Sequence, residues 1–334
     1  MMHKDFFDLR QVWKTTQTSK GTFASSLFVG TLFSTAFPFQ MSQPIYFPET
    51  KAASTTVEVD FGDKTAPKKH AIAYWSIRGL GAPLSMMLCA AKTPFTLFLY
   101  DLVEKGEDGW HSDYFAAKGE YIKEYKQPLW NLPFCVDREN KRVICQTSAV
   151  FSHLGKSCGM FGDDEPATSD CEMLLAEIYD LREVMRTYVY EPNPEEPTAI
   201  IANAGKHFKK FEAWLEIQAD DSNTETKVKV VHLVNGKFSA PDFHLFEMLD
   251  QFEALAKESG EDLYANFNRI KDFKTGFEAL PENQFYLNSW LHKDLAFNNV
   301  VGRFGGLPGP KPYIRGESAK DATWRGKGTV ELSE

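Results

Sequence analysis

One short segment places a phenol and a guanidinium at the corner between a strand and a helix. Residues 70–83 read HAIAYWSIRGLGAP, with Tyr74 near the end of a strand-like run and Arg78 at the start of a glycine-containing turn. A phenol hydroxyl that donates a hydrogen bond to an anion favours the charged form of that anion. Tyr74 is therefore a candidate stabiliser of an anionic ligand group. The alternative is a tyrosine that simply suits a strand and satisfies its hydroxyl at the sheet edge.

A second segment has the features of an anion site. Gln146 and Thr147 lie where a predicted strand ends and a predicted helix begins. The free amide hydrogens of a helix N-terminus, together with a capping hydroxyl, attract carboxylate or phosphate groups. The alternative is an ordinary helix cap without a ligand. The eight histidines show no spacing typical of metal ligands, and His153 fits a packed helix residue, so we expect no metal.

Composition and charge exclude several classes of protein. The 334 residues carry a formal net charge of −9, which argues against nucleic acid as a partner because phosphate binding needs a basic face. A hydrophobic fraction of 43% indicates a packed globular chain with one large or two smaller domains. The five cysteines lack zinc spacing and lie mostly in apolar runs, which predicts buried free thiols in a reducing compartment. They are Cys89, Cys135, Cys145, Cys158 and Cys171.

The elements that would position Tyr74 and Gln146 follow the order β-α-β and then β-β-α. Runs of β-branched and aromatic residues predict the strands, and apolar density predicts the helices. The strands are expected at 70–77, 95–103, 132–137 and 142–145, and the helices at 83–92 and 147–156, the second opening with the Thr147 hydroxyl as its cap. This order predicts one small mixed sheet covered by helices, of the size of a thioredoxin-like domain.

From residue 170 onward, helical periodicity replaces the strand signals. Helices are expected at 170–190, 199–218, 241–258 and 263–277, the third with Ser239 as its cap and Asp242 at the capping-box position. The predicted fold class is an α/β thioredoxin-like N-terminal domain followed by an all-α C-terminal domain. The expected boundaries are 70–158 and 159–300, with a leader or linker at 1–69 and a glycine- and proline-rich surface tail at 301–334.

The first 69 residues are expected to lie outside the folded part. Residues 24–36 form a short apolar run that ends in small residues, as in a secretory leader, and Phe37 after the candidate cut also fits the leaders of complex plastids. This run is too short and too polar to span a membrane permanently. The long charged region before it favours the alternative that Met41 starts a cytosolic chain. Residues 41–69 have the composition of a linker.

Three segments follow one another as they do in cytosolic glutathione transferases. They are YWSIRGLGAP at 74–83, Asn131-Leu132-Pro133 and Gln146-Thr147-Ser148. The aromatic–tryptophan pair and the asparagine before Leu132 make the chain resemble the mu class most. The resemblance runs from about residue 71 to about residue 300 and is strongest in the N-terminal third. The three motifs in this order are quite specific, whereas each alone is weak.

The resemblance implies that the ligand is glutathione, a tripeptide whose thiol must become a thiolate to attack an electrophile. Tyr74 matches the thiolate-stabilising tyrosine of the family. Leu132-Pro133 matches a cis-proline corner whose backbone pairs with the cysteinyl part of glutathione, and an ordinary trans proline is the alternative. The other implied glutathione-binding residues in these motifs are Trp75, Leu80, Asn131, Gln146 and Thr147, the last of which stands where the family more often has serine.

The loop at 106–125 is longer than in the mu pattern. The resemblance implies a tryptophan and a lysine here that bind the glycyl carboxylate of glutathione. Trp110 or Tyr114 would supply the aromatic group, and Lys118 or Lys123 the amine; Trp110 and Lys118 are the first choices. Tyr114 and Lys118 are four residues apart, a spacing that would put both on one face of a helix.

Two residues of the helical part complete the implied site. Asp180 aligns with the acid that reaches the glutathione amine of a neighbouring subunit, and Tyr190 aligns with the second mu-class tyrosine, which faces the electrophile. The alternative for Asp180 is a solvated acid beside Arg182 and Arg186. The alternative for Tyr190 is an aromatic residue that packs at the end of a helix.

The implied function is a glutathione S-transferase that conjugates glutathione, its co-substrate, to small hydrophobic electrophiles in detoxification. The resemblance further implies a cytoplasmic homodimer without nucleic-acid partner or stable membrane insertion; a cleaved leader at 1–36 would instead imply a plastid or secretory route. A glutathione-dependent isomerase is one alternative. A catalytically silent binding or structural protein of the same fold is another, because Ser76 replaces the acid of the family and the loop length differs.

Overall fold

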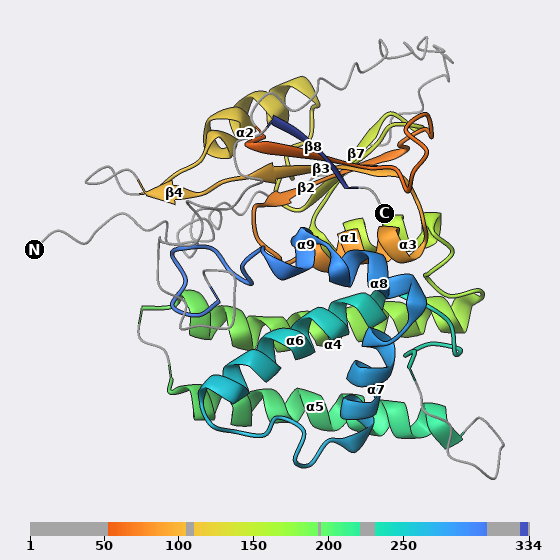
Figure 1. The fold of residues 1–334 in the computed structure, drawn as a ribbon, viewed down its shortest axis with the longest axis vertical. Helices are drawn as coiled ribbons and strands as arrows, with labels where there is room; N and C mark the ends of the chain where they lie inside the picture. Colours follow the sequence, from red (N-terminus) through yellow and green to blue (C-terminus); the bar gives the residue numbers. More distant parts are fainter. Residues whose placement is uncertain (1–52, 105–109, 193–194, 221–230, 306–327, 333–334) are drawn as a thin grey trace, which may run out of the picture. The chain divides into compact units, whose positions relative to one another are not determined.

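A six-stranded mixed sheet forms the centre of the N-terminal part of the chain (Figure 1). The computed structural model describes residues 53–104, 110–192, 195–220, 231–305 and 328–332. The strand order is β7-β6-β2-β3-β1-β8, with β2 parallel to β3 and antiparallel to β6. The strands are β1 Thr55–Val59, β2 His70–Trp75, β3 Phe95–Tyr100, β6 Phe134–Asp137, β7 Arg142–Cys145 and β8 Gly328–Leu332. Tyr74 therefore lies near the end of a strand in the middle of the sheet.

Helices cover both faces of this sheet, as Figure 1 shows. Helix α2 (Asp113–Glu124) lies on one face, and α1 (Gly81–Ala90) and α3 (Thr147–Ser157) lie on the other. Every residue of α1 is buried, because this helix packs between the sheet and helices α6 and α8. A helix that is apolar on all sides is typical of such a central position. Before α2, β4 (Val103–Glu104) and β5 (Trp110–His111) form a separate antiparallel pair.

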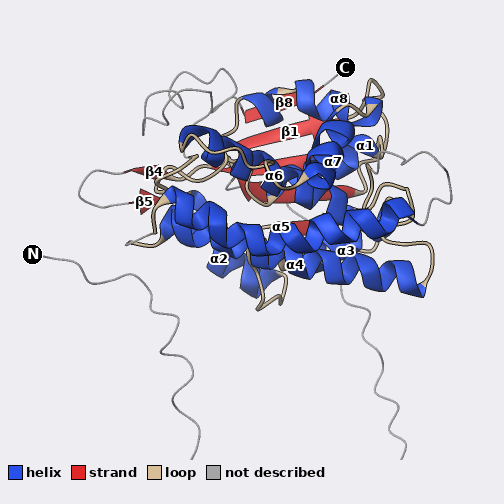
Figure 2. Cartoon of the chain, turned by 90° about the horizontal axis from the view of Figure 1, so that it is seen from below, coloured by secondary structure: helices blue, strands red, loops and turns tan. Residues whose placement is uncertain are grey.

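Between residues 165 and 293 the described elements are helices, and Figure 2 shows these helices in front of the sheet. The helices are α4 Glu165–Tyr190, α5 Pro197–Asp220, α6 Ala240–Glu258, α7 Asn268–Glu278, α8 Pro281–Asn288 and α9 Trp290–Lys293. The Asp164 carboxylate accepts a hydrogen bond from the Ala167 N–H at 2.8 Å, and the Asp242 carboxylate accepts one from the Ser239 N–H at 2.7 Å. Such caps satisfy amide hydrogens at helix starts. The predicted fold class is confirmed; the boundary at residue 158 stays a prediction.

Two apolar cores lie on the two faces of the sheet. Side chains alternate along a strand, so that Ile72 joins the core formed with α1, α3 and the later helices, whereas Ala73 joins the core beneath α2. Tyr74 packs with Ile77 and Leu80 in the second of these cores. The end of β2 is therefore held by close packing, which fixes the direction of the Tyr74 ring.

The expected linker at 41–69 is wrong for residues 55–59, which form β1. Thr55, Val57 and Val59 are buried and the residues between them are only partly buried, so the short run TTVEV has the alternation of a strand. Strand β1 pairs antiparallel with β3, and β8, within the expected surface tail, pairs parallel with β1. A five-residue strand in polar surroundings carries little signal without its partner. The leader prediction for residues 24–37 and Met41 lies outside the described residues.

Three local expectations also need correction. The segment expected as a loop at 106–125 contains α2, whose cap Ser112 accepts a hydrogen bond from the Tyr114 N–H at 3.4 Å. The cap of α3 is Gln146 rather than Thr147, and no side chain caps that helix. Helices α8 and α9 lie where no element was expected, because they are too short to show a clear period.

The cysteines are free thiols, as predicted. Four are buried and Cys158 is half-buried. None of the helices in the described ranges combines the length and the apolar character that a membrane span requires.

His244 in α6 makes stability sensitive to acid. Its side chain is 2% exposed and stacks on Phe151 at 4.8 Å, and neither ring nitrogen has a hydrogen-bond partner among the described residues. Burial, with a smaller contribution from Arg182, lowers the pKa of His244 from 6.5 to about 3. Below pH 6.5 the unfolded chain binds a proton that the folded chain does not. The free energy of unfolding should therefore fall by about 1.4 kcal/mol per pH unit for this group.

The substitution His244→Phe should remove this part of the pH dependence. Between pH 6.5 and pH 5 the variant should lose roughly 2 kcal/mol less unfolding free energy than the wild type. Urea unfolding at several pH values measures both losses. The unfolding free energy of the variant should still depend on pH, because burial also lowers the pKa of His292 to about 3. His111→Phe, at a side chain 41% exposed, is the control; equal slopes for His244→Phe and wild type would contradict the prediction.

Candidate active site

Tyr74 is the second-last residue of β2, and the turn that follows encloses its ring. The residue is 5% exposed, and a Cβ atom would lie 2.9 Å from its hydroxyl if placed at Gly79 and 2.8 Å from its ring if placed at Gly81. Only glycine leaves room for the ring at these two positions. Within the described part of the chain, no group hydrogen-bonds the Tyr74 hydroxyl. The phenol ring is thus fixed in place, and its hydroxyl can donate a hydrogen bond to a ligand.

Tyr190, at the end of α4, lies in the same region. Its hydroxyl accepts a hydrogen bond from the Asn299 N–H at 3.0 Å. Burial raises the pKa of Tyr190 to about 12, opposed by the Asn299 N–H and assisted by the phenol of Tyr74. Residues 296–299 hydrogen-bond both Tyr190 and the turn after Tyr74, so the fold brings the two phenols to one region. At neutral pH Tyr190 stays protonated and retains a hydrogen-bond donor.

The segment at 294–305 braces the turn after Tyr74. The N–H groups of Arg78 and Gly79 donate to the carbonyl oxygens of Ala296 and Phe297 at 2.7 and 3.0 Å. These backbone hydrogen bonds connect the turn directly to the chain that also contacts Tyr190. The geometry around both phenols therefore depends on a segment far from Tyr74 in the sequence.

Several predicted glutathione-binding residues gather near the ends of β2 and β7. The ring of Trp75 lies 5.3 Å from that of Tyr114, which shares α2 with Lys118. Burial raises the pKa of the Cys145 thiol, whereas the Asn131 N–H and the Lys118 charge lower it. Cys145, the last residue of β7, belongs to the same apolar cluster as Tyr114 of α2, the helix that carries Lys118. The structure brings residues from three separate sequence motifs to one region.

The two predicted backbone corners are present in this region. The Leu132–Pro133 peptide bond is cis, directly before β6. Gln146 has φ +75°, and its Nε2 donates to the Leu129 carbonyl oxygen at 3.3 Å. A non-glycine residue in this backbone region is uncommon and is found disproportionately at functional sites. With Thr147 as the first residue of α3 and no side-chain cap, amide hydrogens at this helix start remain available.

Of the remaining predicted residues, Leu80 packs in the same apolar cluster as Tyr74 and Trp75, whereas no described contact joins Asp180 to this group. Asp180 is exposed on α4, and Leu80 is a buried residue at the start of α1. Trp110 lies in β5, but its side chain is outside the described part of the structure. Their roles stay predictions.

Arg78 has a role in the site that sequence reasoning missed. Its Nη2 lies 2.7 Å from a Glu247 carboxylate oxygen and 2.6 Å from one of Asp250, and its side chain is 5% exposed. Its guanidinium also lies 4.5 Å from the centre of the Phe297 ring. Arg78 therefore ties the turn after Tyr74 to α6 and to the 294–305 segment. The arginine was visible in the motif, but partners 169 and 172 residues away were not.

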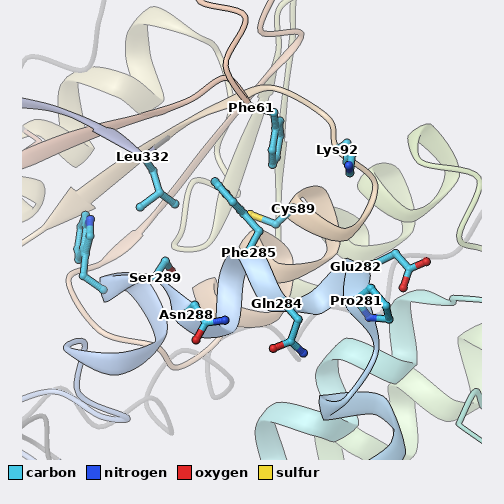
Figure 3. Close-up of a pocket in the computed structure, with 11 residues that line it drawn as sticks. Phe61, Cys89, Lys92, Pro281, Glu282, Gln284, Phe285, Asn288, Ser289 and Leu332 are labelled. Atoms are coloured by element: carbon cyan, nitrogen blue, oxygen red, sulfur yellow. The ribbon is translucent and has the colours of Figure 1, made fainter. Parts of the chain in front are cut away.

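A pocket of about 600 Å³ lies away from these residues, beside α1 and α8 (Figure 3). Phe61, Phe285 and Leu332 form part of its apolar lining, and the rings of Phe61 and Phe285 are 4.9 Å apart. Figure 3 also shows Lys92 and Cys89 at this pocket. None of the predicted glutathione-binding residues lines it, so its size does not make it the candidate site.

Comparisons with known sequences show similarity to glutathione S-transferases. Residues 179–290 match the family profile described as the glutathione S-transferase C-terminal domain. The class-mu 26 kDa isozyme 51 glutathione S-transferase of Fasciola hepatica is 25% identical over 235 residues, which cover 70% of this chain and 95% of the relative. Glutathione S-transferase Mu 5 of Rattus norvegicus is 23% identical over 239 residues, which cover 71% and 96% of the two chains.

Solved structures share the fold. A Pi-class glutathione S-transferase of Onchocerca volvulus has a TM-score of 0.54 at 22% identity, covering 70% of this chain and 99% of its own. The glutathione S-transferase Blo t 8 has the same TM-score at 24% identity, with the same coverage. The profile match and the nearly full coverage of these relatives make the chain similar to glutathione S-transferases over about 70% of its length.

Proposed function

We propose that this protein is a mu-like glutathione transferase that conjugates glutathione to small apolar electrophiles. The observation that carries the proposal is the Tyr74 hydroxyl, a donor without a protein partner among the described residues, held near the end of the central strand. A donor so placed would hydrogen-bond the glutathione sulfur and favour its thiolate. Each unit by which the thiol pKa falls corresponds to about 1.4 kcal/mol.

The chemistry requires positioning rather than a covalent enzyme intermediate. The glutathione thiol gives its proton to solvent, and the thiolate forms a bond to the electrophilic carbon. The leaving group departs with its electron pair, or an unsaturated electrophile takes up a proton. Binding both reactants in one site adds the gain of proximity. Tyr190, protonated and in the same region as Tyr74, would donate a hydrogen bond to the electrophile as charge develops on it.

Glutathione would lie along the cis corner and the start of α3. The backbone at Leu132 would pair with the cysteinyl part, and the free N–H groups after Gln146 would hold the γ-glutamyl carboxylate. Lys118, on α2, would attract the glycyl carboxylate, together with an aromatic neighbour from the same segment. The ligand thus receives local positive charge although the chain is acidic overall.

A homodimer is part of the proposal. Asp180 lies beside Tyr179, which is 39% exposed, and α4 also carries Met173 at 56% exposure. A second copy that covers this helix would bury apolar surface and bring Asp180 to the glutathione amine of its partner. Detoxification in the cytoplasm is the proposed setting, and sequencing the mature N-terminus would separate it from a plastid or secretory route.

Product stoichiometry tests the proposed function. The full chain is incubated with glutathione and an aryl halide, and both reactants are followed. A transferase consumes them in a ratio of one to one and forms a thioether. Conversion of an isomerisable substrate without net loss of glutathione would instead indicate an isomerase. Glutathione binding without turnover of either substrate would indicate a silent binding protein.

A further inference from the structure

We propose that His70, Cys135 and His153 bind one transition metal ion of the zinc class at the end of the sheet remote from Tyr74. One candidate ligand atom from each residue lies within 4.8 Å of the others. They come from β2, β6 and α3, so their spacing in the sequence does not indicate a metal site. His70 begins β2 and Tyr74 is its fifth residue, which separates the cluster from the phenol by about 13 Å along the strand. The glutathione site does not use these side chains.

His70 is oriented as a metal ligand would be. Its Nε2 lies 2.8 Å from the Ser157 hydroxyl, and its Nδ1 faces the Cys135 sulfur at 4.0 Å. A metal-binding histidine typically directs its second ring nitrogen to a hydrogen-bonding group, which fixes the ring and the tautomer. Ser157 has this role here and leaves Nδ1 for the ion. His70 and Cys135 are 3% and 0% exposed, so the two ligands are held by packing.

His153 supplies the third ligand and the route for an ion to enter. Its side chain is 26% exposed, and its ring meets that of His70 edge to face at 5.5 Å. The Nε2 atom is buried without a hydrogen-bond partner in the described ranges, 3.4 Å from an Asp137 carboxylate oxygen. A buried ring nitrogen without a partner is costly unless it binds something. A metal ion would satisfy it.

Asp137 supplies the charge that a buried cation needs. Its carboxylate is 3% exposed and is held by the Asn140 N–H and Nδ2 at 2.9 and 2.7 Å. A divalent ion, the Cys135 thiolate and this carboxylate sum to zero charge, which limits the cost of burial. The nearby cation Lys69 is paired with Glu139 at 3.1 Å. Asp137 or a water molecule would complete a four-coordinate site.

The protonation states of the cluster suit a metal. Burial lowers the pKa of both His70 and His153, and their mutual repulsion adds to the effect at His70. Neutral imidazole is the form that coordinates a metal ion. Burial raises the pKa of the Cys135 thiol, so that the thiol would lose its proton as the ion binds.

The donor set selects the class of ion. Two imidazole nitrogens and a thiolate suit zinc and its softer relatives, whereas magnesium and calcium prefer oxygen ligands. In a tetrahedral zinc site the ligand atoms are roughly 3.3–3.7 Å apart, so the cluster has to contract by about 1 Å. The ion would then connect β2, β6 and α3, and stabilise the folded state by mass action.

Direct metal binding tests the proposal on the full chain. The protein is treated with a chelator, dialysed against zinc or cobalt(II), and its metal content is measured. We expect one ion per chain, a thiolate-to-cobalt absorption band and a higher melting temperature with zinc. Cys135→Ser should abolish the band, and His153→Gln should weaken binding by about 10–100-fold. Cys158→Ser, at a half-buried cysteine outside the ligand set, is the matched control.

His153→Gln keeps the test decisive if Cys135→Ser fails to fold, because His153 is partly exposed. Wild-type protein that holds no zinc after dialysis would overturn the proposal. Unchanged affinity in folded His153→Gln together with an unchanged cobalt band would also overturn it. Loss of the band in Cys158→Ser but not in Cys135→Ser would place the ion elsewhere and contradict the assignment.

Discussion

Replacement of Tyr74 by phenylalanine should lower kcat/KM for conjugation by about 10- to 100-fold near pH 6.5. The substitution removes only the hydroxyl, and a hydrogen bond to a charged group contributes about 1.5–3 kcal/mol. The bound glutathione thiol should accordingly titrate about one to two pH units higher in the variant. The rate deficit should then shrink as the pH is raised, because the thiol ionises without help at high pH. Steady-state kinetics over pH and ultraviolet titration of the bound thiolate measure both effects.

Tyr264→Phe is the matched control for this experiment. Its hydroxyl donates to Glu253 at 3.2 Å, near the end of α6, so the same atom is deleted without touching the candidate site. Its pH–rate profile should match the wild type. A Tyr74→Phe deficit of the same size at every pH would show that the phenol does not act on thiol ionisation, and an unimpaired variant would exclude Tyr74 as the thiolate donor.

Replacement of Arg78 by methionine should destabilise the fold by about 3–5 kcal/mol, because the buried Glu247 carboxylate would lose its cation. Asp250 would keep Lys274 at 3.3 Å. Burial alone would lower the pKa of Arg78, but Glu247 and Asp250 raise it. Burial opposes ionisation of Asp250, yet Arg78 and Lys274 bring its pKa down to about 2. Glu247 is 2% exposed, and burial raises its pKa even with Arg78 present. Without the guanidinium, Glu247 should bind a proton.

Urea unfolding of Arg78→Met at pH 8 and pH 5 measures this cost. The deficit should be smaller at pH 5, where proton uptake neutralises Glu247. Lys210→Met is the control, because Lys210 contacts Glu177 at 2.8 Å but its side chain is 60% exposed. An exposed pair of this kind contributes less than about 1 kcal/mol. Similar stabilities for the two variants, or a deficit independent of pH, would contradict this account of Arg78.

The sequence predicted the elements with strong local signals. The helix expected at 241–258 is α6 at Ala240–Glu258, because proline and a capping carboxylate define its start. The hairpin expected from 132 to 145 is the antiparallel pair β6–β7. By contrast, β1 and β8 could not be predicted, since each is only five residues long and depends on distant partners: β1 pairs with both β3 and β8, and β8 forms the sheet edge.

Some features of the candidate site could likewise be predicted from the sequence, and others could not. Tyr74, the cis Leu132–Pro133 bond and the Gln146 corner could be predicted because each is a compact motif with its own backbone chemistry. The partners of Arg78 and the hydrogen bond from Asn299 to Tyr190 could not, because residues more than a hundred positions apart form them. Sequence spacing reports neighbours along a chain, whereas these contacts depend on how packed elements cross.

The sequence by itself therefore determined the fold class, the strand with Tyr74 near its end and the turns that follow it. Tertiary structure alone decided that Arg78 is buried against α6, that two phenols share one region, and that His70, Cys135 and His153 meet. The physical reason is that adjacent residues determine local backbone preferences. Ion pairs and ligand clusters instead require that side chains from separate elements pack at fixed distances.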